Sequence, residues 1–418
     1  MGTAVEVTVS KTDVQPPEHD PGIRELRDAI PAHCFESSYT TSFYYVARDL
    51  AIVAALALAA LHFIPSIPSP VYRFVAWAIY GFTQGLVGTG LWVLAHECGH
   101  GAFSPNQRVN DVVGWLLHSA LLTPYFSWKS THRRHHMYAN HMERDHHYVP
   151  LRRDTYAAKV GTTVENLEHL TEDVPIVTFL RIIVQQIFGW PWYVLFNITS
   201  GPESTFPRKR GKWFKNSHID PTSSLFSPHE FGSIVLSDIG LGLTAFGLWH
   251  LGNLVGSRTT IYLYVVPYLW VNHWIVAATY LHHTHPSVPR YEGQSWTFLR
   301  GALATVDRDV GWIGRFFFHN IIDYHVIHHI FPRIPFYHAE EATNAIRPLL
   351  GPKYIHDKPS SFMLGLWQAF TECQWVESDK TKGTESGALW FKGGPSPAPE
   401  YSMRSWRTLP FTNSKVWM

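Results

Sequence analysis

The sequence predicts an all-α polytopic membrane protein: four transmembrane helices in two hairpins, with interfacial helices and a cytosolic cap that carries histidine-rich motifs. Charged residues make up only 16% of the 418 residues, against roughly 25% in typical soluble domains. Aromatic residues reach 15%, including 17 Trp and 19 Tyr, and such residues are enriched at membrane–water interfaces. Four apolar stretches in two close pairs complete the argument.

The two pairs of apolar stretches are each joined by a short break. The first pair is joined by the turn PSIPSP, and the second is interrupted only around Arg258. Because a helix of about 20 residues crosses the hydrocarbon core, each pair predicts one helical hairpin. The four expected spans are 50–64, 74–95, 239–257 and 259–280.

Two further apolar stretches suit a crossing less well. Residues 112–127 are few for a span, and residues 182–200 are interrupted by Pro191, so we expect both to be interfacial or re-entrant. Outside the membrane domain, expected at 41–375, residues 1–40 form a cytosolic arm that begins with a disordered stretch. Residues 376–418 form a cytosolic tail rich in Pro, Gly and Ser.

Basic residues orient the predicted bundle. Arg133, Arg134, Arg152, Arg153 and the stretch RKRGKWFK from Arg208 all lie between the two hairpins, which places this segment in the cytosol. An even number of spans then puts the N-terminal arm and the segment after the fourth span on the same side. The net charge of +1 gives no reason to expect nucleic-acid binding, and three cysteines exclude a disulfide framework or a four-cysteine zinc site.

Three histidine motifs lie just outside the apolar spans, on the predicted cytosolic side. They read HECGH, HRRHH and HVIHH, in a chain with 26 histidines. Residues three and four apart share one face of a helix, so each motif presents its imidazoles together. The histidines concerned are His96, His100, His132, His135, His136, His325, His328 and His329.

The number of histidines decides between two interpretations of HECGH. HExxH is also the zinc motif of metallopeptidases, in which Glu97 would be the general base. A catalytic zinc needs only three protein ligands, which leaves two motifs unexplained. Eight or nine nitrogens favour a dinuclear site, although imidazole suits zinc, copper, iron and nickel alike. A metal transporter would need ligands at mid-membrane depth, whereas these motifs lie at the ends of spans or beyond them.

A ninth ligand has several candidates. The sequence YLHHTHP at the end of the fourth span offers His282, His283 and His285, and His319 precedes the third motif by six residues. Spacing alone leaves this choice open.

Five stretches in order carry a resemblance to a known family: AHECGHGAFS, THRRHH, YLHHTHP, LRGALATVDRD and HVIHH. In these the chain resembles the membrane-bound acyl-lipid fatty acid desaturases, the omega-6/omega-3 group of oleate and linoleate desaturases of plants and fungi. The resemblance extends from LRDAIPAHCFESS, at residue 26, to ECQWVE, which ends at residue 377.

The resemblance implies a diiron centre that activates dioxygen and leaves a cis double bond in a C18 acyl chain carried by a lipid. The two iron ions would be held by the eight histidines of the three motifs, with His283 as the ninth ligand because the family has a His-Thr pair at that place. Glu97 would support the site instead of acting as a base. We also expect Trp92, Trp115, Trp128 and Phe126 either to line an acyl tunnel or to belong to the core and the interfacial belt.

The resemblance also implies partners and a location. Electrons would come from a separate cytochrome b5 and its NADH-dependent reductase, because the chain has no HPGG haem segment. The protein is expected in the endoplasmic reticulum membrane, with both termini and the active site cytosolic.

The position of the new double bond is the finer question. HVIHHIFPRIPFYH is similar to omega-3 members, whereas ANHMERDHHYVP and ECQWVE are similar to fungal oleate desaturases. The sequence therefore favours a Δ12/omega-3 enzyme, leaning toward conversion of linoleate to alpha-linolenate, and it leaves bifunctional action at both positions open. A Δ12-only oleate desaturase and an oleate hydroxylase of the same family are the alternatives.

Overall fold

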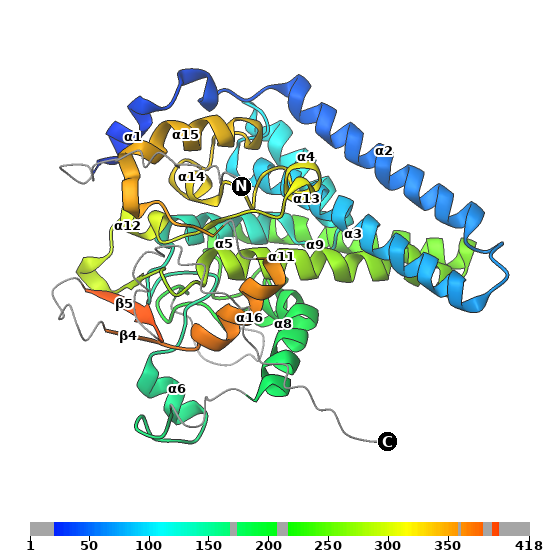
Figure 1. The fold of residues 1–418 in the computed structure, drawn as a ribbon. Coiled ribbons are helices and arrows are strands. Elements are labelled where there is room, and N and C mark those ends of the chain that lie inside the picture. The colour runs from blue at the N-terminus through cyan, green and yellow to red at the C-terminus, as the bar shows by residue number, and fades with distance from the viewer. Residues whose placement is uncertain (1–20, 168–173, 207–215, 358–360, 379–386, 393–418) are drawn as a thin grey trace, which may run out of the picture.

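Four helices long and apolar enough to cross a membrane, further helices packed beside them and a cap of shorter elements make up the described part of the protein in the computed structural model (Figure 1). The structure describes residues 21–167, 174–206, 216–357, 361–378 and 387–392. The arm before residue 21, the stretch RKRGKWFK and most of the expected tail lie outside the described residues. The long helices are α2 (Tyr39–Phe63), α3 (Pro70–His100), α9 (Phe231–Val255) and α11 (Val266–His283).

The four predicted spans are confirmed, because these are the four helices that are long and apolar enough to cross a membrane within the described part of the chain. Their ends differ from the expected ranges. The helix α3 continues past residue 95 through both histidines of the first motif, and α9 begins at Phe231. An apolar window detects only the continuous apolar part of a helix, so end turns that contain polar or charged residues are missed.

The break in the second pair lies at Gly256, two residues before the expected Arg258. Gly256 has φ 85° and ends α9. Arg258 lies in α10 (Ser257–Thr260), and a π-helical turn, η3 (Ile261–Val265), leads into α11. A glycine costs nothing at positive φ, which explains why the turn forms there.

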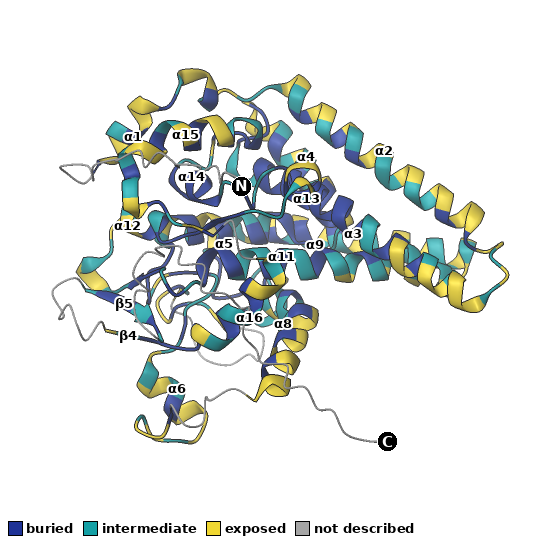
Figure 2. Cartoon of the chain, in the orientation of Figure 1, coloured by how far each residue is buried: buried dark blue, intermediate teal, exposed yellow. Residues whose placement is uncertain are grey.

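Side-chain exposure distinguishes the outer helices α2 and α9 from the central helix α3 (Figure 2). In α2, Leu58 and Phe63 are largely exposed, and in α9 Phe246 and Trp249 are as well. By contrast, 78% of the most apolar window of α3 is buried. Large exposed apolar surfaces are rare in soluble monomers, so the outer helices α2 and α9 have the surface expected of helices in contact with lipid.

Glycines on one face of α3 let it approach α11 closely. A Cβ at Gly85 would lie 2.3 Å from the Cβ of Trp270, and one at Gly81 would lie 2.6 Å from Val266. Small residues at such spacing are a common way for membrane helices to pack without a hydrophobic driving force. The close contact aligns the ends of α3 and α11, where His100 and His283 lie.

The two stretches expected at the interface form helices with other limits. Residues 112–127 are divided between α4 (Gln107–Ala120) and α5 (Tyr125–Tyr138), because Leu122 takes φ 49° and Pro124 precedes α5. The second stretch belongs to α8 (Pro175–Phe196), which passes through Pro191 without ending. The expected interruption at Pro191 is therefore wrong.

The cap lies at the histidine end of α3 and α11 (Figure 1). Its helices are α1 (Ile23–Ala29), η1 (Ala32–Phe35), α6 (Arg153–Lys159), η2 (Pro228–Glu230), η4 (Gly293–Ser295), α12 (Phe298–Leu303), α13 (Trp312–Phe317), α14 (His325–Ile330), η5 (Phe336–His338), α15 (Ala339–Leu350), η6 (Gly351–Lys353) and α16 (Phe362–Glu372). An antiparallel sheet has the order β1 (Arg290–Tyr291), β5 (Ala388–Phe391) and β4 (Val376–Ser378), with Arg290 opposite Leu389. A parallel pair joins β2 (Asp307–Arg308) to β3 (His356–Asp357).

Residues from both ends of the described chain pack into the cap. Leu26 and Cys34 share a hydrophobic cluster with Val326 and Ile330 of α14. Near the other end, Leu389 and Val376 pack with Met142. The predicted domain boundaries at 40 and 376 stay predictions, and the residues on both sides of each contribute to one packed body.

Candidate metal centre

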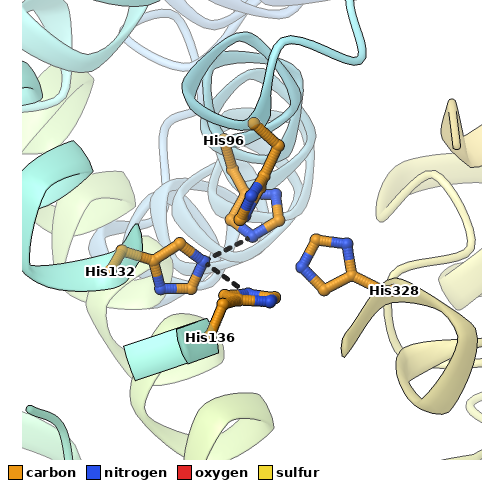
Figure 3. Close-up of side chains that lie close together, drawn as sticks. His96, His132, His136 and His328 are labelled. Atoms are coloured by element: carbon orange, nitrogen blue, oxygen red, sulfur yellow. Dashed lines mark hydrogen bonds between the residues drawn. The ribbon is translucent and has the colours of Figure 1, made fainter. Parts of the chain in front are cut away.

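Four helices bring the nine predicted histidines together. His96 and His100 end α3, where Gly101 at φ 73° stops the helix. The remaining ligand candidates lie on α5, at the end of α11 and on α14. Figure 3 shows four of the nine, from α3, α5 and α14, with their rings close together: His96, His132, His136 and His328.

The nine side chains fall into two groups. In the first group, the ring nitrogens of His96, His100, His132, His136 and His328 lie within 4.8 Å of one another. In the second group, ring nitrogens of His135, His283 and His329 also lie within 4.8 Å of one another. His325 joins this group, because its Nε2 lies 3.3 Å from His283 Nε2. The fold therefore offers two adjacent sets of imidazoles, which is the arrangement that two metal ions would need.

Several ring nitrogens either lie close to another ring nitrogen or have no hydrogen-bond partner. His132 Nε2 lies 3.0 Å from His96 Nε2 and 3.2 Å from His136 Nε2, and one proton cannot serve both contacts. Within the described residues, the buried Nε2 atoms of His100, His328 and His329 have no hydrogen-bond partner. Since buried polar atoms are nearly always paired, these lone pairs fit a metal ion as their missing partner.

The protonation states suit the same role. Burial and then repulsion from neighbouring histidines lower the pKa of His132, His325 and His328 well below the ordinary value of 6.5. The same two causes lower the pKa of His136 and His329. These imidazoles are neutral at physiological pH, and a neutral imidazole is the form that binds a metal.

A buried carboxylate orients one of the rings. Asp145 Oδ1 lies 2.7 Å from His135 Nδ1 and also accepts from the backbone N–H of His147. Burial opposes ionisation of Asp145, but the contacts with His135, Arg290 and His147 outweigh it and lower the pKa of the carboxyl group. With the Nδ1 proton directed to Asp145, His135 is left with Nε2 as its free donor atom.

His147 has a similar place beside a second ring. Its Nε2 lies 3.4 Å from His132 Nδ1, and its ring stacks on that of His135 with centroids 3.9 Å apart. Trp128, one turn earlier in α5, stacks on His132 with ring centroids 4.4 Å apart. Sequence reasoning assigned no role to Asp145 or His147, although both lie in the DHH run that follows the second histidine motif.

The stretch LRGALATVDRD positions the short helix α14. Asp307 Oδ1 accepts from the backbone N–H of Val326 at 2.7 Å, and its Oδ2 accepts from the Tyr354 hydroxyl. Arg308 donates to the carbonyl of Leu281, two residues before His283. An anion at the first turn of a helix satisfies otherwise unpaired N–H groups, so these two residues tie the third histidine motif to the end of α11.

Glu97 has a supporting contact. Its Oε2 accepts from the backbone N–H of Phe336 at 3.0 Å, while its Oε1 lies 3.6 Å from His96 Nδ1. A carboxylate already engaged by the backbone of the cap is poorly placed to activate water. This geometry agrees with the expectation that Glu97 supports the site.

The candidates for the ninth ligand differ clearly in position. His283 Nε2 lies 3.2 Å from His135 Nε2, whereas His319 Nε2 pairs with Asp49 at 2.8 Å. His285 lies 3.9 Å from Asp357, and His282 stacks on His325 with centroids 3.9 Å apart. The structure brings His283 together with the other predicted ligands, and the assignment of all nine stays a prediction.

A cavity of about 600 Å³ opens onto both groups, within the range of about 300–1,000 Å³ typical of ligand sites. His96, His132, His135, His283 and His325 lie in its wall. The rest of the wall is mostly apolar and comes largely from α3, α8 and α11, and Asp145 and His147 are also among the lining residues. Trp92 and Trp128 line the cavity and also belong to one buried hydrophobic cluster, so the structure agrees with the core role and leaves the tunnel role a prediction. Trp115 and Phe126 are not among the lining residues, and Trp115 donates to the carbonyl of Leu236 in α9.

Comparison with known proteins decides the family. The family model for fatty acid desaturases matches residues 72–360. The chain belongs to the fatty acid desaturase family. It is 45% identical over 386 residues to an oleate hydroxylase of Claviceps purpurea, covering 89% of this chain and 81% of that protein.

Two further relatives are desaturases. The Δ12 fatty acid desaturase of Mortierella isabellina is 42% identical over 362 residues, covering 85% of this chain and 88% of the relative. The Δ12-oleate desaturase of Trichosanthes kirilowii is 39% identical over 370 residues, covering 88% and 95%. The protein is thus a membrane-associated oxidoreductase that acts on fatty acyl lipids, and its two histidine groups are compatible with a histidine-ligated metal site.

Proposed function

We propose that this desaturase introduces a cis double bond at the Δ12 position of oleoyl chains carried by a membrane lipid. The observation that carries the proposal is the apolar cavity that ends at both histidine groups. Support for the position comes from the relatives, since those named above are Δ12 desaturases and an oleate hydroxylase. The expected lean toward linoleate and omega-3 desaturation finds no counterpart among them.

The nine histidines are proposed to hold two iron ions, which when bound would supply the activation of dioxygen. The residues of the chain have separate tasks. The walls from α3, α8 and α11 hold the acyl chain in a fixed register and exclude water, so that one methylene lies next to the histidines. Asp145 and His147 hold two of the rings in place, so the donor atoms face inward before any metal binds.

Electrons are proposed to arrive from cytochrome b5 and its NADH-dependent reductase, at the cytosolic face of the endoplasmic reticulum. A second hollow of about 500 Å³ supports this route. His100, His136 and His329 line it, together with the exposed Arg133 and Arg333. This positive charge favours the approach of an acidic protein.

Two other activities have specific support. Hydroxylation of oleate is favoured by the 45% identity to the hydroxylase of Claviceps purpurea. Desaturation of linoleate at the omega-3 position is favoured by the run HVIHHIFPRIPFYH alone. Both activities would use the same site, so they differ from Δ12 desaturation only in which methylene is presented and in the fate of the carbon that loses its hydrogen.

Expression in a yeast that makes oleate but no polyunsaturated fatty acid tests the proposal. Fatty acid methyl esters are analysed by gas chromatography from cultures with and without added linoleate. We expect 18:2 from endogenous oleate. A ricinoleate peak without 18:2 would establish hydroxylation, and 18:3 formed only from added linoleate would establish omega-3 desaturation. Either result would overturn the Δ12 assignment.

A further inference from the structure

A second cluster of metal-binding side chains lies outside the site described above. His33 and Cys34 belong to η1, His338 ends η5, and Glu341 is in the first turn of α15. The donor atoms of all four lie within 4.8 Å of one another. Two segments about 300 residues apart along the chain thus contribute two ligand types each.

The cluster has one buried anchor and one open side. Cys34 is fully buried, and its Sγ lies 3.8 Å from His33 Nε2. His33 Nε2 lies 2.9 Å from Glu341 Oε2, and both of these side chains are about half exposed, at 55% and 51%. The His33 and His338 rings meet edge to face with centroids 5.4 Å apart. An ion could enter from solvent and meet the sulfur at the bottom of the cluster.

The spacing of the ligands supports a site more than a chance surface contact. His338 and Glu341 are three residues apart at the start of a helix, so they share one face. Ion pairs between exposed side chains stabilise a fold only weakly, and a pair of His33 with Glu341 would give no reason for a thiol and a second imidazole to converge on the same point.

We propose that His33, Cys34, His338 and Glu341 bind a zinc ion. One sulfur, two imidazole nitrogens and one carboxylate oxygen are donors that zinc accepts in four-coordinate sites. A thiolate separates this site from the nine-histidine centre, because soft sulfur ligands favour zinc over the hard divalent cations. The site is distinct from the iron centre in ligands and in place.

The zinc ion would fasten the N-terminal segment to the cap. Cys34 packs in the same hydrophobic cluster as Val326, Ile327 and Ile330 of α14, and that helix carries His328 and His329. On the other side of the ion, His338 belongs to the same short helix, η5, as Phe336, whose backbone N–H donates to Glu97. A bound zinc therefore stabilises the segments behind two histidine motifs without touching the reacting atoms.

Cobalt substitution tests the proposal in the purified full-length protein loaded with iron. Co²⁺ bound to a thiolate gives a sulfur-to-metal charge-transfer band in the near ultraviolet, whereas Co²⁺ on histidines alone gives none. We expect the band to saturate at one equivalent and to be bleached by Zn²⁺. It should be lost in Cys34→Ser and retained in the matched control Cys373→Ser, which changes a buried cysteine elsewhere in the cap.

A second variant keeps the test decisive if Cys34→Ser does not fold. Glu341→Gln removes a half-exposed ligand and should weaken cobalt binding about tenfold or more while leaving the band. Absence of the band in the parent protein, its survival in Cys34→Ser, or unchanged affinity in Glu341→Gln would overturn the proposal. A band that Zn²⁺ fails to bleach would overturn the choice of zinc.

Discussion

Two of the nine histidines have an identified partner behind the ring. Asp145 holds the Nδ1 side of His135, and His147 holds that of His132. Asp145 is in turn fixed by the backbone N–H of Asn140 and lies 3.9 Å from Arg290, which donates to the carbonyl of His283. One buried carboxylate thus connects ligands on α5 and α11.

Asp145→Asn tests this connection. The amide keeps the size of the side chain but removes the charge that favours the Nδ1–H tautomer of His135, so iron affinity should fall by roughly 10- to 100-fold. Titration of metal-free protein with Fe²⁺ measures the change. Asp28→Asn, at an exposed carboxylate that pairs with Arg24, is the control, and equal affinities in the two variants would contradict the role of Asp145.

His328→Ala tests the ligand set itself. His328 lies in the first group of five nitrogens, and its loss should lower product formation by at least about 100-fold, because a ligand matters more than its supporting partner. The protein should still insert in the membrane, since α14 is short and lies in the cap. His250→Ala, on the exposed face of α9, should leave activity unchanged.

The residue types in the motifs predicted the ligands, but they did not predict the residues that hold the ligand rings in place. Spacing of three and four residues requires only a helix, so the eight motif histidines could be named without a fold. The roles of Asp145 and Arg290 depend on which segments the cap brings together, and no local pattern contains that information. From the sequence, His283 could be preferred over His319 as the ninth ligand only by resemblance. The structure adds a physical reason, because the ring of His319 is already paired with Asp49.

At the scale of elements, the apolar spans were predictable because a helix that crosses the hydrocarbon core needs about 20 predominantly apolar residues. The helix ends were less so. Proline at 191 suggested a break, yet α8 continues because a proline can kink a helix without ending it, and the adjacent Trp190 is buried against the neighbouring helices. The contact of Gly189 with Val276, at 3.1 Å from an added Cβ, shows how closely α8 packs on α11 at this point.

Gly85→Ala tests the packing that aligns α3 with α11. The new methyl group would lie 2.3 Å from Trp270 Cβ, so the helices must separate, at a cost of about 1–3 kcal/mol. We expect a lower Tm in detergent and reduced activity. Gly247→Ala in α9, where a Cβ meets nothing within 4 Å, should show neither loss. A similar Tm for the two variants would contradict the proposed close contact.

At the scale of the whole molecule, buried neutral histidines should make the metal-free protein sensitive to acid. Their pKa is lowered in the folded state, whereas the unfolded chain protonates near 6.5. The unfolded state then binds more protons below that pH, so stability is retained above about 6.5 and falls progressively as pH decreases.

Thermal unfolding of iron-free protein in detergent between pH 5 and 7.5 measures this effect. The Tm should fall steeply below about pH 6.5, and bound iron should reduce the fall because a metal competes with protons for the same nitrogens. A His136→Gln/His329→Gln double variant should flatten the curve. A Tm independent of pH in the parent protein would mean that these rings are not buried as neutral groups.

The convergence of four distant segments on two adjacent groups of nitrogens is the central feature of the molecule. Metal analysis of purified protein that is active on oleoyl lipid tests it most directly. We predict two iron atoms per chain, with iron lost in proportion to activity in His328→Ala. Full activity with one iron atom or none per chain would contradict a two-iron centre held by these nine histidines.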